Sequence, residues 1–210
     1  MQPRPPLLLT LDLEGVLIPE VWIAVAERTG VEELRLTTRD IPDYDQLMLH
    51  RLQLLRDNRL TLPDIQAVIR TLTPLPGGAE FLARLRQHWQ VIILSDTFYE
   101  FADPLMIQLD RPTLFCNSLE IDKNGAITDY HLRLKDGKRQ AVEAFRRLNF
   151  EILAMGDSYN DTTMLAAAHR GILFRPSSKV KQEFPHFPAV EEYNQALELI
   201  QEFADKGGEE

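Results

Sequence analysis

The chain contains a single cysteine, Cys116, among 210 residues. One thiol cannot form an internal disulfide, nor can it build a multi-cysteine zinc site. Long apolar runs are also missing, because no stretch approaches the roughly 18 apolar residues that a transmembrane helix needs. The proline-rich start, Met1–Pro6, lacks the apolar region of a signal peptide. These absences predict a protein of the cytoplasm that has no membrane partner.

Positive charge is scarce as well. The 23 lysines and arginines are outnumbered by 32 aspartates and glutamates, which gives a formal net charge of −9. Nucleic acid backbones are bound by clustered basic side chains, so this balance argues against nucleic acid as the main partner. A small phosphorylated molecule needs only a local group of cations and remains compatible with it. The oligomeric state is not fixed by composition, which leaves a homodimer open.

Apolar runs alternate with helical patterns along most of the chain. This order predicts an α/β fold, namely a Rossmann-like parallel sheet with helices on both faces. The strands are expected at Leu7–Leu13, Val91–Leu94, Thr113–Cys116, Glu151–Met155 and Gly171–Phe174. Helices are expected after the breaker Pro76-Gly77-Gly78 and over Gln140–Leu148.

Two segments interrupt this alternation. From Pro19 to about Thr73 the pattern is helical only. We therefore expect a helical cap over residues 16–75, inserted into a catalytic core of residues 1–15 and 76–210. The second segment, Leu119–Leu134, alternates apolar and polar residues around Asn124-Gly125, which is a strong hairpin turn signal.

Two carboxylates follow the first predicted strand. Asp12 and Glu14 come directly behind the apolar run Leu7–Leu11. An aspartate can attack phosphorus to form an aspartyl-phosphate, and a second acid can protonate the leaving alkoxide. Residues i and i+2 of an extended chain share a side, so we assign Asp12 as nucleophile and Glu14 as acid/base. Solvated acids at the end of a strand are the alternative interpretation.

A second acidic pair changes this balance. Asp157 and Asp161 follow the predicted strand that ends at Met155. The carboxyl ends of parallel strands lie at one edge of a sheet, where ligands bind. Mg²⁺ prefers oxygen ligands, so we expect Asp12, Asp157 and the Glu14 main-chain carbonyl as ligands, with Asp161 in the outer shell. Acidic caps of a helix N-terminus would produce the same pattern.

Phosphate also needs hydrogen-bond donors. Ser95 follows the strand Val91–Leu94, and the backbone N–H groups of Asp96 and Thr97 could form an anion-binding loop there. A plain turn would also fit this pattern. A cation is expected ahead of the helix that starts near Gln140, but the pattern alone does not choose between Lys135 and Lys138.

Taken in order, these residues resemble the four motifs of the haloacid-dehalogenase-like phosphatases. The motifs are Asp12-x-Glu14, Ser95, Lys138 and Gly156-Asp157-x-x-x-Asp161, and the likeness runs from about Leu7 to Leu199. Within that superfamily the chain resembles the phosphoserine phosphatase branch, which has a helical cap after the first motif. Longer strings resemble members of the branch that also transfer the phosphoryl group to homoserine: Asp12–Val16, Thr37–Asp45, Ser95–Phe101 and Gly156–Thr162.

The resemblance implies further roles. It makes Lys138, rather than Lys135, the lysine that binds phosphate, and it places Asn160 against phosphate or substrate. It also implies that Glu20 and Arg51 hold the amino and carboxylate groups of phosphoserine, a carboxylate being a good partner for the fork of an arginine. Without the resemblance, Arg51 reads as a solvated helix residue.

Two departures from the family pattern stand out. Glu14 replaces the aspartate of most relatives, and Ser95-Asp96-Thr97 replaces a serine followed by glycines. The longer acid could admit a larger acceptor, and the extra side chains must narrow or re-aim the pocket. The sequence thus predicts a Mg²⁺-dependent phosphoserine phosphatase that works through a phospho-aspartate and also transfers to homoserine. A phosphatase for a nucleotide or sugar phosphate is the alternative enzyme. A non-catalytic phospho-relay module is disfavoured by Glu14 and the cap.

Overall fold

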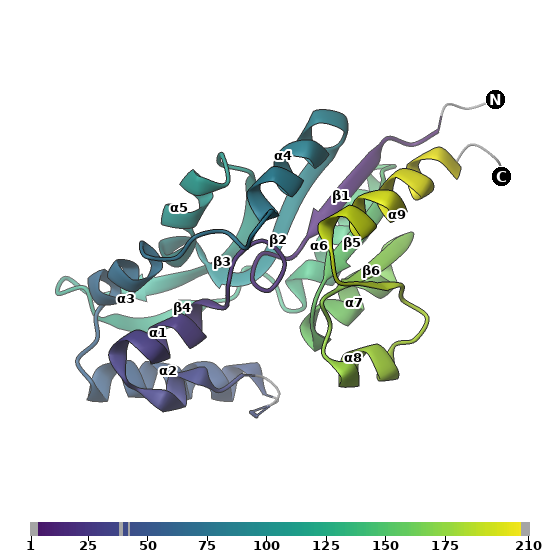
Figure 1. Ribbon diagram of the computed structural model, residues 1–210. Helices are drawn as coiled ribbons and strands as arrows, with labels where there is room; N and C mark the ends of the chain where they lie inside the picture. The colour runs from purple at the N-terminus through teal and green to yellow at the C-terminus, as the bar shows by residue number, and fades with distance from the viewer. Residues whose placement is uncertain (1–3, 38–39, 42, 207–210) are drawn as a thin grey trace.

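A seven-stranded sheet forms the centre of the molecule (Figure 1). The computed structural model describes residues 4–37, 40–41 and 43–206. The strand order is β4-β3-β2-β1-β5-β6-β7, and every neighbouring pair is parallel except β3 with β4. This arrangement confirms the predicted α/β class. The strands are β1 (Leu7–Leu11), β2 (Gln90–Phe98), β3 (Thr113–Ile121), β4 (Ile127–His131), β5 (Glu151–Gly156), β6 (Arg170–Phe174) and β7 (Ala189–Val190).

Helices cover both faces of this sheet and also build a group of their own beside it. Those that follow β1 directly are α1 (Val21–Thr29), the 3₁₀ helix η1 (Glu32–Arg35), α2 (Tyr44–Asp57) and α3 (Leu62–Ile69). The rest are α4 (Gly78–His88), α5 (Tyr99–Gln108), α6 (Gly137–Arg147), η2 (Tyr159–Asp161), α7 (Thr162–Ala167), α8 (Ser178–Glu183) and α9 (Tyr193–Lys206). Elements α5, α8, β7 and α9 were not expected from the sequence.

The central strands are buried on both faces, and their side chains alternate between two apolar clusters. In β5, Leu153 and Met155 belong to one cluster, while Ile152 and Ala154 belong to the other. The first cluster includes side chains of α4 and α9, and the second includes side chains of α6, α7 and α8. A strand that is buried on both faces needs apolar residues at successive positions, because neither face meets water.

The strand order reverses at β1. From β1 the chain builds one half of the sheet through β2 and β3, and the other half through β5, β6 and β7. Crevices open beyond the carboxyl ends of strands at such a reversal point. Asp12 lies at this point, immediately after Leu11.

Several predicted boundaries need correction. β1 ends at Leu11, two residues before the expected end. β2 does not stop at Leu94 but continues to Phe98, with an irregular register against β3 over this stretch. Helix α6 begins at Gly137, so Lys138 lies in its first turn instead of preceding it.

The segment Leu119–Leu134 was predicted as a hairpin, and this is confirmed by the antiparallel pairing of β3 with β4. Its turn closes where Gly125 N donates to Asp122 O at 3.0 Å, and Gly125 has a φ of 84°. That left-handed backbone explains the glycine. The hairpin extends the sheet toward the helices that follow β1, because β4 packs against α2.

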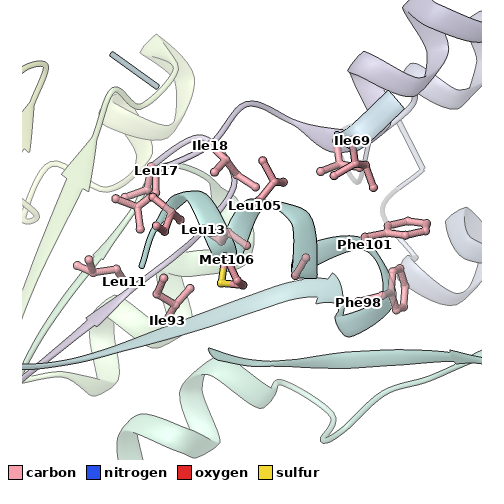
Figure 2. Close-up of a cluster of buried hydrophobic side chains, with 14 of the residues drawn as sticks. Leu11, Leu13, Leu17, Ile18, Ile69, Ile93, Phe98, Phe101, Leu105 and Met106 are labelled. Atoms are coloured by element: carbon pink, nitrogen blue, oxygen red, sulfur yellow. The ribbon is translucent and has the colours of Figure 1, made fainter. Parts of the chain in front are cut away.

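The helices between β1 and α4 share one apolar cluster with the sheet. Val25, Met48 and Ile65 of this helical segment are fully buried and belong to the same cluster as Phe98 and Phe101. Figure 2 shows part of this cluster, from the end of β1 to α5 and α3. Whether residues 16–75 form a separate cap domain stays a prediction. Thr38, Arg39 and Pro42 of the quoted motif lie outside the described residues, as do residues 1–3 and 207–210 of the predicted core.

Across the described part of the chain, every helix is too short or too polar to cross a lipid bilayer.

His169 ties the start of β5 to the residue before β6. Ile152 N donates to His169 Nδ1 at 2.9 Å, and His169 N donates back to Ile152 O at 2.9 Å. Partial burial, aided by Arg146, lowers the pKa of His169 below its ordinary value of 6.5. A protonated Nδ1 could not accept the hydrogen bond, so protonation favours the unfolded chain. This contribution to stability is complete above the unfolded pKa and is lost as the pH falls through the folded one.

We therefore expect the free energy of unfolding in urea to fall between about pH 7.5 and about pH 5 more steeply for the wild type than for His169→Asn. The asparagine offers an acceptor oxygen but does not titrate. Equal losses in both proteins would contradict this role of His169.

Candidate active site

Three carboxylates from two strand ends meet at the reversal point of the sheet. One oxygen from each of Asp12, Asp157 and Asp161 lies within 4.8 Å of the others. Their backbones are fixed by the pairing of β1 with β5, which continues past the strand where Asp12 N donates to Met155 O at 2.9 Å. The predicted convergence of these acids is therefore present.

Two glycines make this close approach feasible. Gly15 has a φ of 75°, and a Cβ built on it would lie 2.6 Å from an oxygen of Asp157. A Cβ on Gly156 would overlap the side chain of Asp161. Both positions are tighter than any real Cβ contact tolerates. Side chains there would push the carboxylates out of their cluster.

Lys138 lies among these acids and is only 4% exposed. Its Nζ is 2.9 Å from Asp12 Oδ1, 2.8 Å from Asp161 Oδ1 and 3.3 Å from Asp96 Oδ2. Burial opposes its charge, but the surrounding carboxylates outweigh burial and keep the pKa of Lys138 well above its ordinary value. It stays an ammonium at neutral pH. Lys135, the other candidate, lines a different, neighbouring cavity.

Asp161 is fully buried and uses both of its oxygens. Oδ1 accepts from Lys138, and Oδ2 accepts from the backbone N–H groups of Asp157 at 3.0 Å and Ser158 at 3.1 Å. These bonds fix Asp157 relative to Lys138. Because both oxygens of Asp161 already accept hydrogen bonds, this carboxylate is suited to the outer shell of a metal and not to direct coordination.

The electrostatics of the cluster favour a bound cation. Burial raises the pKa of Asp12 well above its ordinary value, and Asp161 adds to this rise while Lys138 opposes it. Burial and then Asp161 raise the pKa of Asp157 to about 7. Three ionised carboxylates beside one ammonium leave two negative charges, which one divalent cation would balance. An all-oxygen donor set of this charge fits Mg²⁺.

Glu14 lines the same cavity as Asp12, as its spacing predicted. Its Oε2 accepts a hydrogen bond of 2.9 Å from Val21 N at the start of α1. Burial raises the pKa of Glu14, so the carboxyl is suited to hold a proton closer to neutral pH than an ordinary glutamate. Glu14 also shares a hydrogen bond with Glu20, whose pKa rises to about 7 through burial and this neighbouring acid.

Arg51 lies on α2 and is buried, with 7% of its surface exposed. Its guanidinium carbon is 4.6 Å from the centre of the Trp22 ring, and one terminal nitrogen donates to Leu36 O at 2.9 Å. The Nε atom is buried and has no hydrogen-bond partner. Burial lowers the pKa of Arg51 to about 10, which still leaves it charged at neutral pH. A buried cation with an unused donor is a good site for an anion.

Most of these groups line one cavity of about 310 Å³, which we call the inner cavity. It brings together every site residue predicted from the sequence except Asp161, which is fully buried and accepts a hydrogen bond from Lys138. Positive charge is present at two places, with Lys138 beside the acid cluster and Arg51 on α2. The lining residues are Asp12, Glu14, Glu20, Trp22, Ile23, Thr37, Tyr44, Leu47, Arg51, Ser95, Asp96, Thr97, Lys138, Asp157, Ser158, Tyr159 and Asn160.

The predicted phosphate-binding stretch reaches the inner cavity but is already engaged. Thr97 N donates to Ser95 Oγ at 3.2 Å, and the Thr97 side chain hydrogen-bonds to Glu14. Asn160 Nδ2 donates to Asp96 Oδ2 at 2.9 Å. An incoming phosphate would therefore have to compete for part of this donor set.

Sequence reasoning missed the aromatic residues of the site. Trp22 lies under the Arg51 guanidinium, and the Tyr44 hydroxyl donates to Asp96 O at 3.2 Å. Tyr44 thereby joins the start of α2 to β2. The local sequence does not mark either residue as part of a site, because an aromatic residue on a helix usually indicates a position in the hydrophobic core.

Comparisons with known proteins agree with this geometry. Residues 8–169 match the family model of the haloacid dehalogenase-like hydrolases. The chain is 60% identical over 183 residues to the phosphoserine phosphatase ThrH of Pseudomonas aeruginosa, a match that covers 87% of this chain and 89% of that protein. It is 58% identical over 193 residues to a phosphoserine phosphatase of Pseudomonas syringae pv. tomato, with 92% and 80% covered.

A similar solved structure is a phospho-aspartyl intermediate analogue of a phosphoserine phosphatase. It superposes with a TM-score of 0.74 over 94% of this chain and 99% of that chain, at 23% identity. At 23% identity this similarity supports a shared fold and nothing further.

Proposed function

Since the chain belongs to the haloacid dehalogenase-like hydrolase family, we propose that it hydrolyses phosphoserine through a phospho-aspartate on Asp12 and also transfers the phosphoryl group to homoserine. Membership confirms the resemblance drawn from the four motifs. The proposal of substrate is supported by the two curated relatives named as phosphoserine phosphatases and by the inner cavity itself.

In the first step, an oxygen of Asp12 bonds to phosphorus while the bond from phosphorus to the serine oxygen breaks. Glu14 gives its proton to the leaving oxygen, so serine departs as a neutral alcohol. The raised pKa of Glu14 and its fixed position on Val21 N suit this role. Glu14 then takes the proton of the attacking hydroxyl, from water or from homoserine. The bond from phosphorus to Asp12 breaks and the carboxylate is restored.

Charge on the transferring group must be balanced during both steps. We propose Lys138, Ser95 and Asn160 as donors to its oxygens. Mg²⁺, when bound, would supply positive charge against the carboxylates and the phosphoryl oxygens. Its proposed ligands are Asp12, Asp157 and the Glu14 main-chain carbonyl, with Asp161 in the outer shell.

The buried side chain of Arg51 is the observation that best supports an amino acid as the phosphorylated substrate. Its Nε has no partner, although the residue is nearly inaccessible to solvent. A buried donor without a partner is costly, and a substrate carboxylate would satisfy it. Glu20 also lines the inner cavity and provides negative charge for the substrate ammonium. A sugar phosphate or nucleotide offers no carboxylate to match this pair of charges.

Homoserine is proposed as the acceptor because it carries the same ammonium and carboxylate as serine. In-line attack requires the acceptor oxygen to take the place that the serine oxygen has left. An acceptor with one more methylene must therefore fit the subsite of Arg51 and Glu20.

Location in the cytoplasm and a homodimeric state remain predictions from the sequence.

The test follows phosphorus directly. The protein is incubated with phosphoserine and Mg²⁺, with or without homoserine, and ³¹P NMR records inorganic phosphate and phosphohomoserine. We expect inorganic phosphate alone in the first case and phosphohomoserine in addition in the second. Chelation of Mg²⁺ should stop both reactions. 2-Aminobutyrate, which lacks the homoserine hydroxyl, is the matched control and should give no new ester.

Unconsumed phosphoserine would refute the proposed hydrolysis. Release of inorganic phosphate without phosphohomoserine would refute only the transfer.

A further inference from the structure

The Asp96 carboxylate occupies the donors that the proposed mechanism reserves for phosphate. Its Oδ2 lies 3.3 Å from Lys138 Nζ and accepts a hydrogen bond of 2.9 Å from Asn160 Nδ2. A carboxylate oxygen that pairs with an ammonium and an amide imitates one oxygen of a bound phosphate. Asp96 and a phosphoryl group therefore compete for the same two partners.

The backbone of Asp96 is held in place, while its side chain is partly exposed. Its carbonyl oxygen accepts from Tyr44 OH at 3.2 Å and from Asn117 Nδ2 at 3.1 Å. The side chain itself is 41% exposed, whereas that of Lys138 is 4% exposed. A carboxylate that is partly in water can rotate away without loss of backbone contacts.

Space for the displaced carboxylate exists next to the inner cavity. A second cavity of about 980 Å³, here called the outer cavity, shares Asp96, Lys138 and Asn160 with the inner one. Its wall also holds two lysines. Among the described residues Lys135 forms no ion pair, while Lys179 lies 4.0 Å from Glu183 and 5.7 Å from the centre of the Tyr159 ring. Two weakly engaged ammonium groups would accept a carboxylate that leaves Lys138.

We propose that Asp96 is a displaceable plug of the phosphate subsite. Its carboxylate holds Lys138 and Asn160 in the resting protein, and the phosphoryl group of the substrate drives it toward the outer cavity. After hydrolysis the same carboxylate returns to these donors and helps to expel inorganic phosphate. This role rests on the proposed function, because it assumes that phosphate binds at Lys138.

If Asp96 is a plug, then replacing it should strengthen the binding of inorganic phosphate, the product. Part of the affinity for phosphate is spent on breaking the contacts of Asp96 with Lys138 and Asn160. An asparagine at this position keeps the shape and a hydrogen bond to Asn160 but loses the charge that holds Lys138. Phosphate should then bind more tightly, and inhibition by the product should increase.

The experiment measures binding of inorganic phosphate to the full-length protein with Mg²⁺ by isothermal titration calorimetry. We expect the dissociation constant to fall about tenfold in Asp96→Asn and in Asp96→Ala. The inhibition constant of phosphate in the phosphoserine assay should fall in parallel. Asp129→Asn is the matched control, because it removes the same charge from an exposed position on β4. Its phosphate affinity should equal that of the wild type.

Lys138→Ala separates this inference from the proposed function, and Asn160→Ala does so if the buried replacement destabilises the chain. Either change should weaken phosphate binding. If neither weakens it, phosphate does not bind at these donors, and both the proposed function and the plug fail. If they weaken it but both Asp96 variants bind phosphate no more tightly than the wild type, only the plug is refuted.

Discussion

Asp12→Asn is expected to lower turnover of phosphoserine by at least about 10⁴-fold while leaving the protein folded. The amide has nearly the size of the carboxylate, but it cannot attack phosphorus to form a stable ester. Removing a charge from a buried group of three acids also relieves repulsion, which opposes any loss of stability from the weakened contact with Lys138. The measurement is phosphate release under saturating phosphoserine, together with the thermal unfolding temperature.

The matched control for this variant is again Asp129→Asn, whose activity should equal that of the wild type. Covalent labelling gives an independent readout. Acid-quenched wild-type protein should retain ³²P from labelled phosphoserine, and Asp12→Asn should retain none. Turnover by the variant within tenfold of the wild type would remove Asp12 from the role of nucleophile.

The parts of this site that could be predicted from the sequence are those fixed by strand ends. Apolar runs followed by Asp12 and by Asp157 identify two buried strands, and the parallel class then places both acids at one edge of the sheet. The pairing of Leu11 with Met155 then brings the residues that follow these two strands close together. The prediction succeeded because these acids are positioned by main-chain hydrogen bonds, which the side-chain environment does not alter.

Strand ends that carry polar residues were harder to predict. Ser95, Asp96 and Thr97 read as a loop, because polar residues rarely continue a buried strand. In the structure β2 includes them, since the register shift against β3 supplies pairing up to Phe98. The Asp96 side chain reaches Lys138 from this extended backbone. No local pattern records that contact, because its partner lies on another element.

Arg51 shows a different limit. A single arginine on a predicted helix usually reads as solvated, and only the family resemblance marked Arg51 as a site residue. Its burial depends on Trp22 of α1 and on the carbonyl of Leu36 after η1. Three separate segments must pack before the guanidinium leaves water. Tertiary packing of this kind is not encoded in any single stretch of sequence.

Arg51→Ala is expected to raise the KM for phosphoserine about 100-fold, because a charged hydrogen bond to the substrate carboxylate is lost. The effect on turnover should be smaller, since the carboxylate lies away from the reacting phosphorus. Arg56→Ala is the matched control, as it removes an exposed arginine from the same helix. Its kinetics should equal those of the wild type.

A matched substrate decides what Arg51 does. Phosphoethanolamine has the phosphate and the ammonium of phosphoserine but lacks the carboxylate, so its kcat/KM should change by less than about threefold in Arg51→Ala. Arg51→Lys should recover only part of the phosphoserine activity, because an ammonium cannot form the two-pronged contact. An equal loss on both substrates would mean that Arg51 supports the fold through Trp22 and Leu36. Specificity for phosphoserine would then have to come from Glu20, which could not distinguish it from other phosphorylated amines.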